Sequence, residues 1–318
     1  MQLTLAVIWL VGGGVWLLMG GEILVRGALA LARRARISPM VVGLTVVALG
    51  TSAPELVVTI QAALTGHPEL AIANVVGSNI ANVLLVVGLP ALIYPLACDQ
   101  ASARSDALLM LVVSLAFYVI CSDGLIDRLD GGILLAGLVV FLALQARTER
   151  EIPQHSGELP IVLRLPTRGA TIAFLIIAGI IMLPAGSTLL ITGALTIAEE
   201  LNVSTEVIGL TIVALSTSLP ELATTLVAAF KREADVAVGN VLGSNILNLV
   251  AIMGAASLAS VRELEVSQHL FSLDLPLMLL SAVILTVVIF RRGAVGRKLG
   301  AALLGMYILY NYLLYSGL

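Results

Sequence analysis

The chain has 318 residues, of which 59% are hydrophobic and 12% are charged, and its mean hydropathy is +1.07. This composition excludes an ordinary water-soluble globular protein and indicates a protein of the lipid bilayer. The net charge of −3 points to no particular partner, and we expect no nucleic acid among its ligands.

Ten apolar stretches follow one another along the chain, and each approaches the length of about 20 residues that a helix needs to cross a bilayer. The first lacks the basic start and the small-residue cleavage site of a secretory signal peptide, so we expect it to be the first membrane helix. The stretches cover residues 3–31, 38–65, 70–95, 104–122, 131–147, 169–197, 205–230, 236–260, 272–290 and 299–316.

Basic residues are distributed unevenly between the loops. The loops that follow the first, third, fifth, seventh and ninth stretches hold 14 of the 17 Lys and Arg residues, whereas the loops that follow the even-numbered stretches hold only Arg128 and Arg262. Short cytoplasmic loops retain Lys and Arg. The pattern therefore predicts that both chain termini lie on the outer side of the membrane.

One passage of 46 residues occurs twice. Residues 43–88 align without a gap with residues 209–254 at an offset of 166, and 23 positions are identical, including Thr, Ser, Pro, Glu and Asn. Each copy covers the second and third helices of a five-helix half, and because five is odd, the second half must enter the membrane in the opposite sense. We therefore predict an all-α membrane protein with ten transmembrane helices in two inverted repeats. The predicted halves are residues 1–147 and 169–318, joined by a cytoplasmic linker of residues 148–168.

A proline interrupts the first helix of each repeat, at Pro54 and at Pro220. Proline lacks a backbone donor and clashes with the carbonyl four residues earlier, so we predict that helices 2 and 7 are broken and that the carbonyls of Gly50 and Ser216 are free. Irregular backbone is tolerated at membrane depth only where protein buries it or where it lines a cavity. The two breaks therefore predict a binding site.

A glutamate follows each proline, at Glu55 and Glu221. An acidic side chain in a membrane helix costs about 2.5 to 3.5 kcal/mol even on lenient insertion scales, so such residues are functional candidates. No Lys or Arg occurs within residues 37–103 or 169–230, so two buried acids must take up protons or bind a cation. The alternative is a pair of neutral glutamates that bond helix to helix, but it explains neither the prolines nor the neighbouring hydroxyls.

Oxygen-bearing side chains accompany both glutamates. Ca²⁺ takes 6 to 8 oxygen ligands, whereas zinc and copper sites use His or Cys, which these segments do not offer at suitable positions. Gly77 and Gly243 would let the helices approach closely. Asn, Ser and Asn at a spacing of four share one face of the second helix in each repeat. These trios are Asn74, Ser78 and Asn82, and Asn240, Ser244 and Asn248.

Glu22 and Arg26 form a second pair of charges, four residues apart in the first apolar stretch. A local salt bridge on one helix is the simpler interpretation than a role in transport. The matching residues of the second half are Thr188 and Thr192, so the duplication does not support a transport role.

The motif GTSAPE with a following GSNIAN, repeated as STSLPE with GSNILN, resembles the α-repeats of the cation/calcium antiporter superfamily, specifically compact prokaryotic sodium/calcium exchangers. The resemblance implies Ca²⁺/Na⁺ exchange by alternating access, with helices 1 and 6 sliding against the bundle and both ions competing at Glu55 and Glu221. Asn248 stands where many relatives carry Asp, which disfavours a potassium-dependent mode. The further ligands that the resemblance implies are Thr51, Ser52, Thr217, Ser218, Ser78, Ser244, Asn82, Asn248 and the carbonyls of Ala48 and Ala214.

The leading hypothesis is a Na⁺-driven Ca²⁺ antiporter of a prokaryotic inner membrane that works as a monomer without a cofactor. The residues alone leave Na⁺ and H⁺ open as the second ion, so a Ca²⁺/H⁺ exchanger is the alternative. Inverted, proline-broken repeats favour alternating access over a passive channel. An intramembrane enzyme is not expected, because the chain has no HExxH helix and no GxSxG elbow.

Overall fold

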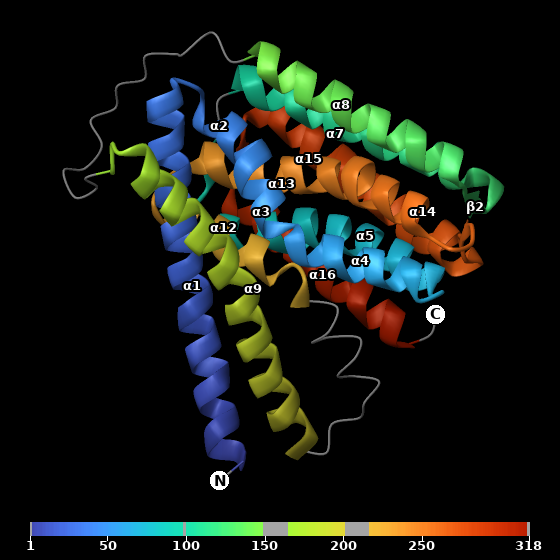
Figure 1. Ribbon diagram of the computed structural model, residues 1–318, viewed down its shortest axis with the longest axis horizontal. Helices are drawn as coiled ribbons and strands as arrows, with labels where there is room; N and C mark the ends of the chain where they lie inside the picture. The colour runs from blue at the N-terminus through green and yellow to red at the C-terminus, as the bar shows by residue number, and fades with distance from the viewer. Residues whose placement is uncertain (1, 98–99, 149–164, 201–215, 317–318) are drawn as a thin grey trace.

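The structure is a computed structural model that describes residues 2–97, 100–148, 165–200 and 216–316. Figure 1 shows a helical bundle in which α1 (Gln2–Ala35) and α9 (Gly169–Glu200) run side by side as a long pair. The other helices pack together beside one end of this pair (Figure 1).

The first half continues with a helix whose start is defined by Ser38 and Pro39. The Ser38 hydroxyl accepts a hydrogen bond from the Val41 N–H at 3.2 Å, and Pro39 occupies the first turn, where its missing N–H is not needed. The segments that follow are α2 (Pro39–Val42), η1 (Gly43–Val47), α3 (Ala48–Thr51), α4 (Ala53–Leu64), α5 (Pro68–Ala81), η2 (Asn82–Val87), α6 (Gly88–Ile93), α7 (Gln100–Ile120), η3 (Cys121–Asp123) and α8 (Arg128–Thr148).

The second half repeats these local structures. The bounds of α4, α5, η2 and α6 recur at the offset of 166 in four segments of the second repeat. The duplicated sequence therefore folds twice in the same local way, although residues 209–215 lie outside the described residues. After α9, the described segments are α12 (Leu219–Phe230), α13 (Ala234–Leu247), η5 (Asn248–Met253), α14 (Gly254–Ala259), η6 (Leu270–Asp274), α15 (Leu275–Arg292) and α16 (Arg297–Ser316).

The helices are those of a membrane protein. Seven helices in the described ranges are long and apolar enough to cross a bilayer, and the run from α2 to α3 forms an eighth span together with α4, at an angle of 47°. Helices α12 and α16 occupy two further predicted stretches, and α12 is the shorter of them. The described helices thus fall on all ten of the predicted apolar stretches.

Four short strands depart from the all-helical prediction. Strand β1 (Leu96–Ala97) pairs antiparallel with β4 (Ala294–Val295), and β2 (Leu125–Ile126) pairs antiparallel with β3 (Leu264–Glu265). Two residues are too few to show a strand periodicity in the sequence. The pairs join loops of the first half to loops of the second half.

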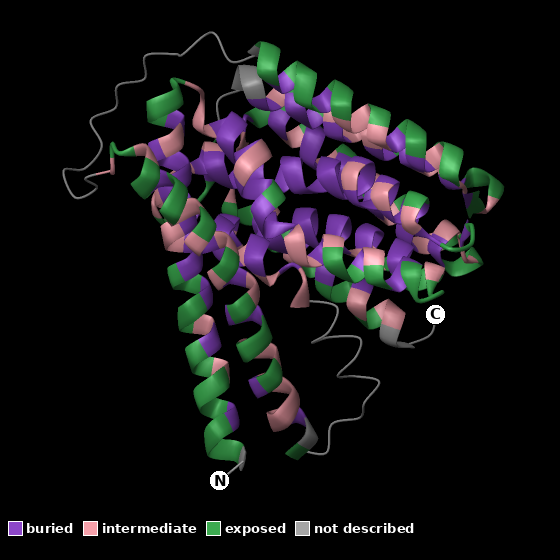
Figure 2. Ribbon diagram, in the orientation of Figure 1, coloured by how far each residue is buried: buried purple, intermediate pink, exposed green. Residues whose placement is uncertain are grey.

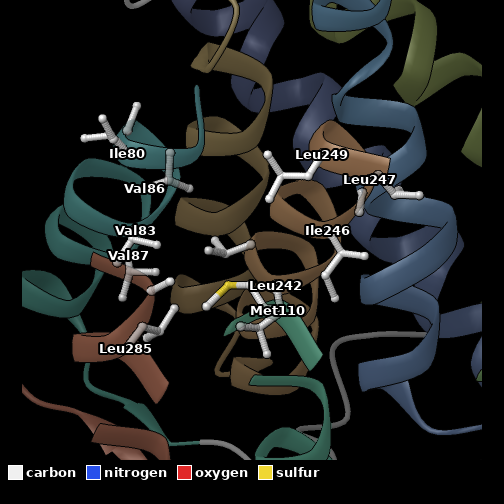
Figure 3. Close-up of a cluster of buried hydrophobic side chains, with 14 of the residues drawn as sticks. Ile80, Val83, Val86, Val87, Met110, Leu242, Ile246, Leu247, Leu249 and Leu285 are labelled. Carbon is white, nitrogen blue, oxygen red and sulfur yellow. The ribbon is translucent and has the colours of Figure 1, made fainter. Parts of the chain in front are cut away.

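The helices that carry the repeats lie at the centre of the bundle. Over the most apolar 18 residues of each span, 94% are buried in the span Ala234–Ala259 and 78% in the span Pro68–Ile93, compared with 22% in α1 and in α9 (Figure 2). A helix that is apolar on all sides is stable where other helices surround it. Figure 3 shows side chains of α5, η2, α7, α13, η5 and α15 packed against one another, including Ile80, Val83, Met110, Leu242 and Ile246.

Glycines line the contact between α1 and α9. A Cβ atom at Gly13 would collide with the backbone of Leu190, and a Cβ atom at Gly193 would lie 2.5 Å from both the Ala6 carbonyl oxygen and the Leu10 nitrogen. Small residues therefore bring the two backbones close together. The glycines of this contact recur every seven residues, at Gly13, Gly20 and Gly27 on α1 and at Gly179, Gly186 and Gly193 on α9.

Candidate functional site

The second helix is interrupted between Thr51 and Ala53, as its proline predicts. Ser52 leaves the helical conformation, with φ −81° and ψ 7°, and Pro54 lies in the first turn of α4. Ser218 has nearly the same dihedral angles, φ −85° and ψ 0°, directly before α12. Both repeats therefore place the start of a helix inside the bundle.

The Ser216 carbonyl, predicted to be released from the helix by Pro220, has a partner from another helix. The Ser187 hydroxyl of α9 donates to the Ser216 oxygen at 2.8 Å. The Ala48 oxygen, a ligand implied by the family resemblance, accepts from the Ser52 N–H at 2.9 Å and from the Thr51 hydroxyl at 3.3 Å. The Ser187 hydroxyl is a tertiary partner that a local proline rule does not include, whereas the partners of the Ala48 oxygen are local.

The two glutamates lie in the first turns of α4 and α12, and neither side chain is exposed to solvent. The Ser52 hydroxyl donates to Glu221 Oε1 at 3.1 Å, so the break in the first repeat reaches the carboxylate of the second. The Glu55 and Glu221 carboxylates repel each other electrostatically. Helix N-termini carry a partial positive charge that favours such carboxylates, so the local backbone offsets part of the burial cost.

Much of this carboxylate pair has no protein partner. Both Glu55 oxygens and Glu221 Oε2 accept no hydrogen bond from the residues that the structure describes. Neither glutamate forms an ion pair with a described Lys, Arg or His residue. Unpaired buried charge is strongly unfavourable, so this arrangement requires protons or a cation from solution.

The polar faces of α5 and α13 lie against the broken helices. The Thr51 hydroxyl donates to Asn240 Oδ1 at 3.2 Å, and the hydroxyls of Ser78 and Thr217 lie 3.4 Å apart. Asn74 Nδ2 donates to the Thr59 hydroxyl at 2.8 Å. The equivalent bond in the second repeat runs from Asn240 Nδ2 to the Thr225 hydroxyl at 3.2 Å. These contacts bring together polar groups from both halves of the chain.

Other predicted ligands are buried on the same elements and have oxygen atoms without a donor from the described residues. Thr224, one helical turn beyond Glu221, also has a buried oxygen without a donor from the described residues, although the sequence did not predict it as a ligand. The matching residue of the first repeat is Val58, so a search for polar residues that occur in both repeats does not find Thr224. The atoms are Ser218 Oγ, Ser244 Oγ, Asn82 Oδ1, Asn248 Oδ1 and Thr224 Oγ1.

The predictions for the carbonyl of Ala214 and for close helix packing at Gly243 and Gly77 have different outcomes. Ala214 lies outside the described residues. The close approach at Gly243 is confirmed, because a Cβ there would collide with the Leu44 carbonyl oxygen. At Gly77 no described atom lies within 4 Å of such a Cβ, and residue 210, which corresponds to Leu44 in the second repeat, is outside the described ranges.

The local charge pair on α1 is confirmed, and it has a third member. Arg26 Nε lies 3.4 Å from Glu22 Oε1, and Lys231 Nζ, just beyond α12, lies 2.7 Å from the same oxygen. The partner from α12 could not be predicted from spacing along one helix. The cluster contains two positive charges and one negative charge.

The donor set of the central site is oxygen-rich. Among the described residues, no group of three or more His, Cys, Asp and Glu side chains is arranged to hold a metal ion. The two carboxylates are instead accompanied by hydroxyl and amide oxygens. Hard cations that accept neutral oxygen ligands suit such a set.

Comparisons with known proteins identify the family. The family model described as "Sodium/calcium exchanger protein" matches residues 5–147 and 171–316. The chain is 37% identical to a candidate antiporter, CaxA, from Alkalimonas amylolytica, over 90% of this chain and 91% of the relative. It is 29% identical to the sodium/calcium exchanger MaX1 of Methanosarcina acetivorans, over 90% of this chain and 91% of the relative.

A solved structure of the sodium-calcium exchanger NCX_Mj has a similar fold. The two chains superpose with a TM-score of 0.83 at 30% sequence identity, and the match covers 96% of this chain and 97% of NCX_Mj. The family match spans most of the chain and the structural match nearly all of it. The protein therefore belongs to the sodium/calcium exchanger family of the cation/calcium antiporter superfamily, among its compact prokaryotic members.

Proposed function

We propose that the protein is a secondary active antiporter that exchanges Ca²⁺ for Na⁺ at one shared site on Glu55 and Glu221. The observation that carries this proposal is the fully buried carboxylate pair, which has no described cationic partner and has three oxygens without a donor. Ca²⁺ would take its ligands from these oxygens and from the neighbouring hydroxyls and amides. Na⁺ would occupy overlapping positions.

The same charge imbalance accounts for exchange rather than one-way transport. An occluded, empty site would hold two negative charges in a low-dielectric interior, which is strongly unfavourable. Bound cations remove that barrier in either direction of movement. The carrier would therefore cross between its two states only when loaded, which couples the flux of one ion to the opposite flux of the other.

The proposed architecture is ten transmembrane helices in two inverted halves, residues 1–147 and 169–318, with both termini outside a prokaryotic inner membrane. The recurrence of α4, α5, η2 and α6 at the offset of 166 supports a duplicated fold. Inverted repeats place the site between the halves, so rocking or sliding of one unit can open it to either side. One chain contains all the proposed ligands, which supports function as a monomer.

Flux measurements in proteoliposomes test the function. Vesicles loaded with Na⁺ and diluted into Na⁺-free medium should take up ⁴⁵Ca²⁺, and vesicles loaded with choline should not. Glu55→Gln and Glu221→Gln should each abolish uptake. Glu69→Gln, the same change at an exposed position of α5, should leave it unchanged. Uptake that persists in both buried variants would refute the shared site.

A pH gradient distinguishes the alternative exchanger. Vesicles without Na⁺, acidic inside, should take up no ⁴⁵Ca²⁺ beyond the leak of protein-free vesicles. Uptake driven by the pH gradient alone would show that protons, not Na⁺, are the counter-ion. Uptake that needs no counter-ion gradient would instead identify a passive channel.

A further inference from the structure

Two asparagines outside the predicted ligand set join the central helices. Asn79 on α5 and Asn245 on α13 are equivalent positions of the two repeats, and both are buried. Asn79 Nδ2 donates to the Asn245 carbonyl oxygen at 3.2 Å, and Asn245 Nδ2 donates to the Asn79 carbonyl oxygen at 3.5 Å. Each side chain therefore uses its amino group to bind the backbone of the opposite helix.

These backbone bonds fix the direction of the Asn79 side chain. A backbone carbonyl can only accept a hydrogen bond, so the amino group of Asn79 must face the Asn245 carbonyl, which leaves its Oδ1 to accept from another donor. This Oδ1 accepts a hydrogen bond from Asn248 Nδ2 at 3.0 Å. Since an amide oxygen can only accept, Asn248 must turn its amino group toward Asn79.

The orientation of Asn248 follows. Its own oxygen, Oδ1, points away from Asn79, is buried and has no donor among the described residues. Asn248 lies on the same face of the helix as Asn240, whose Oδ1 meets Thr51 at the break. A cation binds an amide oxygen and is repelled by the amino group, so the direction of this side chain decides whether it can be a ligand.

We propose that Asn79 is a positioning residue that holds the Asn248 amide with its oxygen toward the transported ion. This inference rests on the proposed function, in which Asn248 is a ligand. Asn79 need not contact the ion, because it acts through the amide that it orients. Its loss would let Asn248 turn its amino group toward the site, which would weaken cation binding.

The second repeat provides an internal control. Asn245 forms the equivalent bond to the opposite backbone, but its Oδ1 has no partner among the described residues, and neither side-chain atom of Asn82 has one. Asn245 therefore joins the helices without orienting a ligand. Replacing either asparagine removes one bond to the opposite backbone, but only the replacement at Asn79 also removes the bond that holds a proposed ligand.

The test compares Asn79→Ala with Asn245→Ala. The measured quantities are the Ca²⁺ concentration at half-maximal Na⁺-driven uptake and the dissociation constant for ⁴⁵Ca²⁺ from equilibrium dialysis of purified protein. We expect Asn79→Ala to raise both by about fivefold, the effect of losing one modest hydrogen bond, and Asn245→Ala to leave them within about twofold. The two variants should melt at similar temperatures.

A double variant shows whether Asn79 acts through Asn248. In an Asn248→Ala background, adding Asn79→Ala should change the dissociation constant no further, because the amide that it positions is gone. Dialysis gives this answer even where the double variant transports too slowly to assay.

Equal effects of Asn79→Ala and Asn245→Ala, or full additivity with Asn248→Ala, would overturn the inference and leave the proposed function intact. Absence of Na⁺-dependent Ca²⁺ uptake and of Ca²⁺ binding in the wild-type protein would instead refute the proposed function itself.

Discussion

The contact between α1 and α9 can be tested with three consecutive glycines. Gly12, Gly13 and Gly14 lie on one turn of α1, but only a Cβ at Gly13 would collide with α9, at the Leu190 backbone. No described atom lies within 4 Å of a Cβ at Gly12. A Cβ at Gly14 would make only an ordinary contact, 3.9 Å from a side-chain carbon of α9. Gly12→Ala and Gly13→Ala are therefore chemically identical changes with opposite surroundings.

The magnitude follows from two effects. Replacing Gly by Ala within a helix favours the helix by about 1 kcal/mol, and this gain is the same at both positions. At Gly13 the added methyl group meets backbone atoms, which cannot rotate away as a side chain can, and overpacking of this kind costs about 1 to 3 kcal/mol. Because the helix term cancels, we expect Gly13→Ala to be less stable than Gly12→Ala by about 1 to 3 kcal/mol.

The assay is unfolding of the purified variants in one detergent, followed by Na⁺-driven ⁴⁵Ca²⁺ uptake in vesicles. Gly13→Ala should melt at the lower temperature and transport more slowly, and Gly12→Ala should resemble the wild type. Equal melting temperatures would show that the backbones of α1 and α9 are not in contact at Gly13. The close packing would then be no basis for treating the two helices as one moving unit.

Two further experiments probe movement and the site. If α1 and α9 slide together, a disulfide between Gly20→Cys and Met182→Cys, whose Cβ positions lie 3.1 Å apart, should permit transport. A disulfide between Gly50→Cys and Ile180→Cys, 3.8 Å apart, should block transport until a reductant is added, because it ties α9 to the broken helix. Transport unaffected by oxidation in both pairs would contradict sliding. Ser52→Ala removes a hydroxyl donor to a buried carboxylate, so we expect about a tenfold rise in the Ca²⁺ concentration at half-maximal uptake. An unchanged value would mean that the hydrogen bond is absent in the working protein.

The features that could be predicted from the sequence depend on local chemistry or on the duplication. Pro54, the second residue after Ser52, removes a helical hydrogen bond, and the same break precedes α12 because Pro220 is present at the equivalent position. The buried state of Glu55 and Glu221 followed from their apolar surroundings and from the lack of nearby basic residues. Neither inference needed any knowledge of how the helices pack.

The features that could not be predicted depend on contacts between distant segments. The hydroxyl that occupies the Ser216 carbonyl comes from α9, and Lys231 reaches Glu22 from beyond α12. The π-helical segments η2 and η5 have no simple sequence signal, yet both begin at the last asparagine of the polar face. Such segments are frequent at functional sites, so their position agrees with the proposed site.

Identical motifs in the two repeats do not have identical environments. The sequence GSN is the same around Asn79 and Asn245, and each lies near a methionine of the equivalent helix in the opposite half, Met278 of α15 and Met110 of α7. Only Asn79, however, accepts a hydrogen bond at Oδ1 from a described residue. The two repeats therefore differ in the contacts of single side chains rather than in the helices around them. The sequence alone assigns both asparagines the same role, because it does not show which side-chain contacts form between the halves.

The central site combines two opposing electrostatic effects. Each glutamate occupies the first turn of a short helix, where backbone N–H groups and the helix dipole favour a negative charge. A helix terminus contributes roughly half an elementary charge, so two termini cannot neutralise two full carboxylate charges. The remaining negative charge makes cation binding favourable, while the partial compensation keeps that binding weak enough to be reversible. A lysine at the site would neutralise it permanently and end transport, which agrees with the absence of Lys and Arg from residues 37–103 and 169–230.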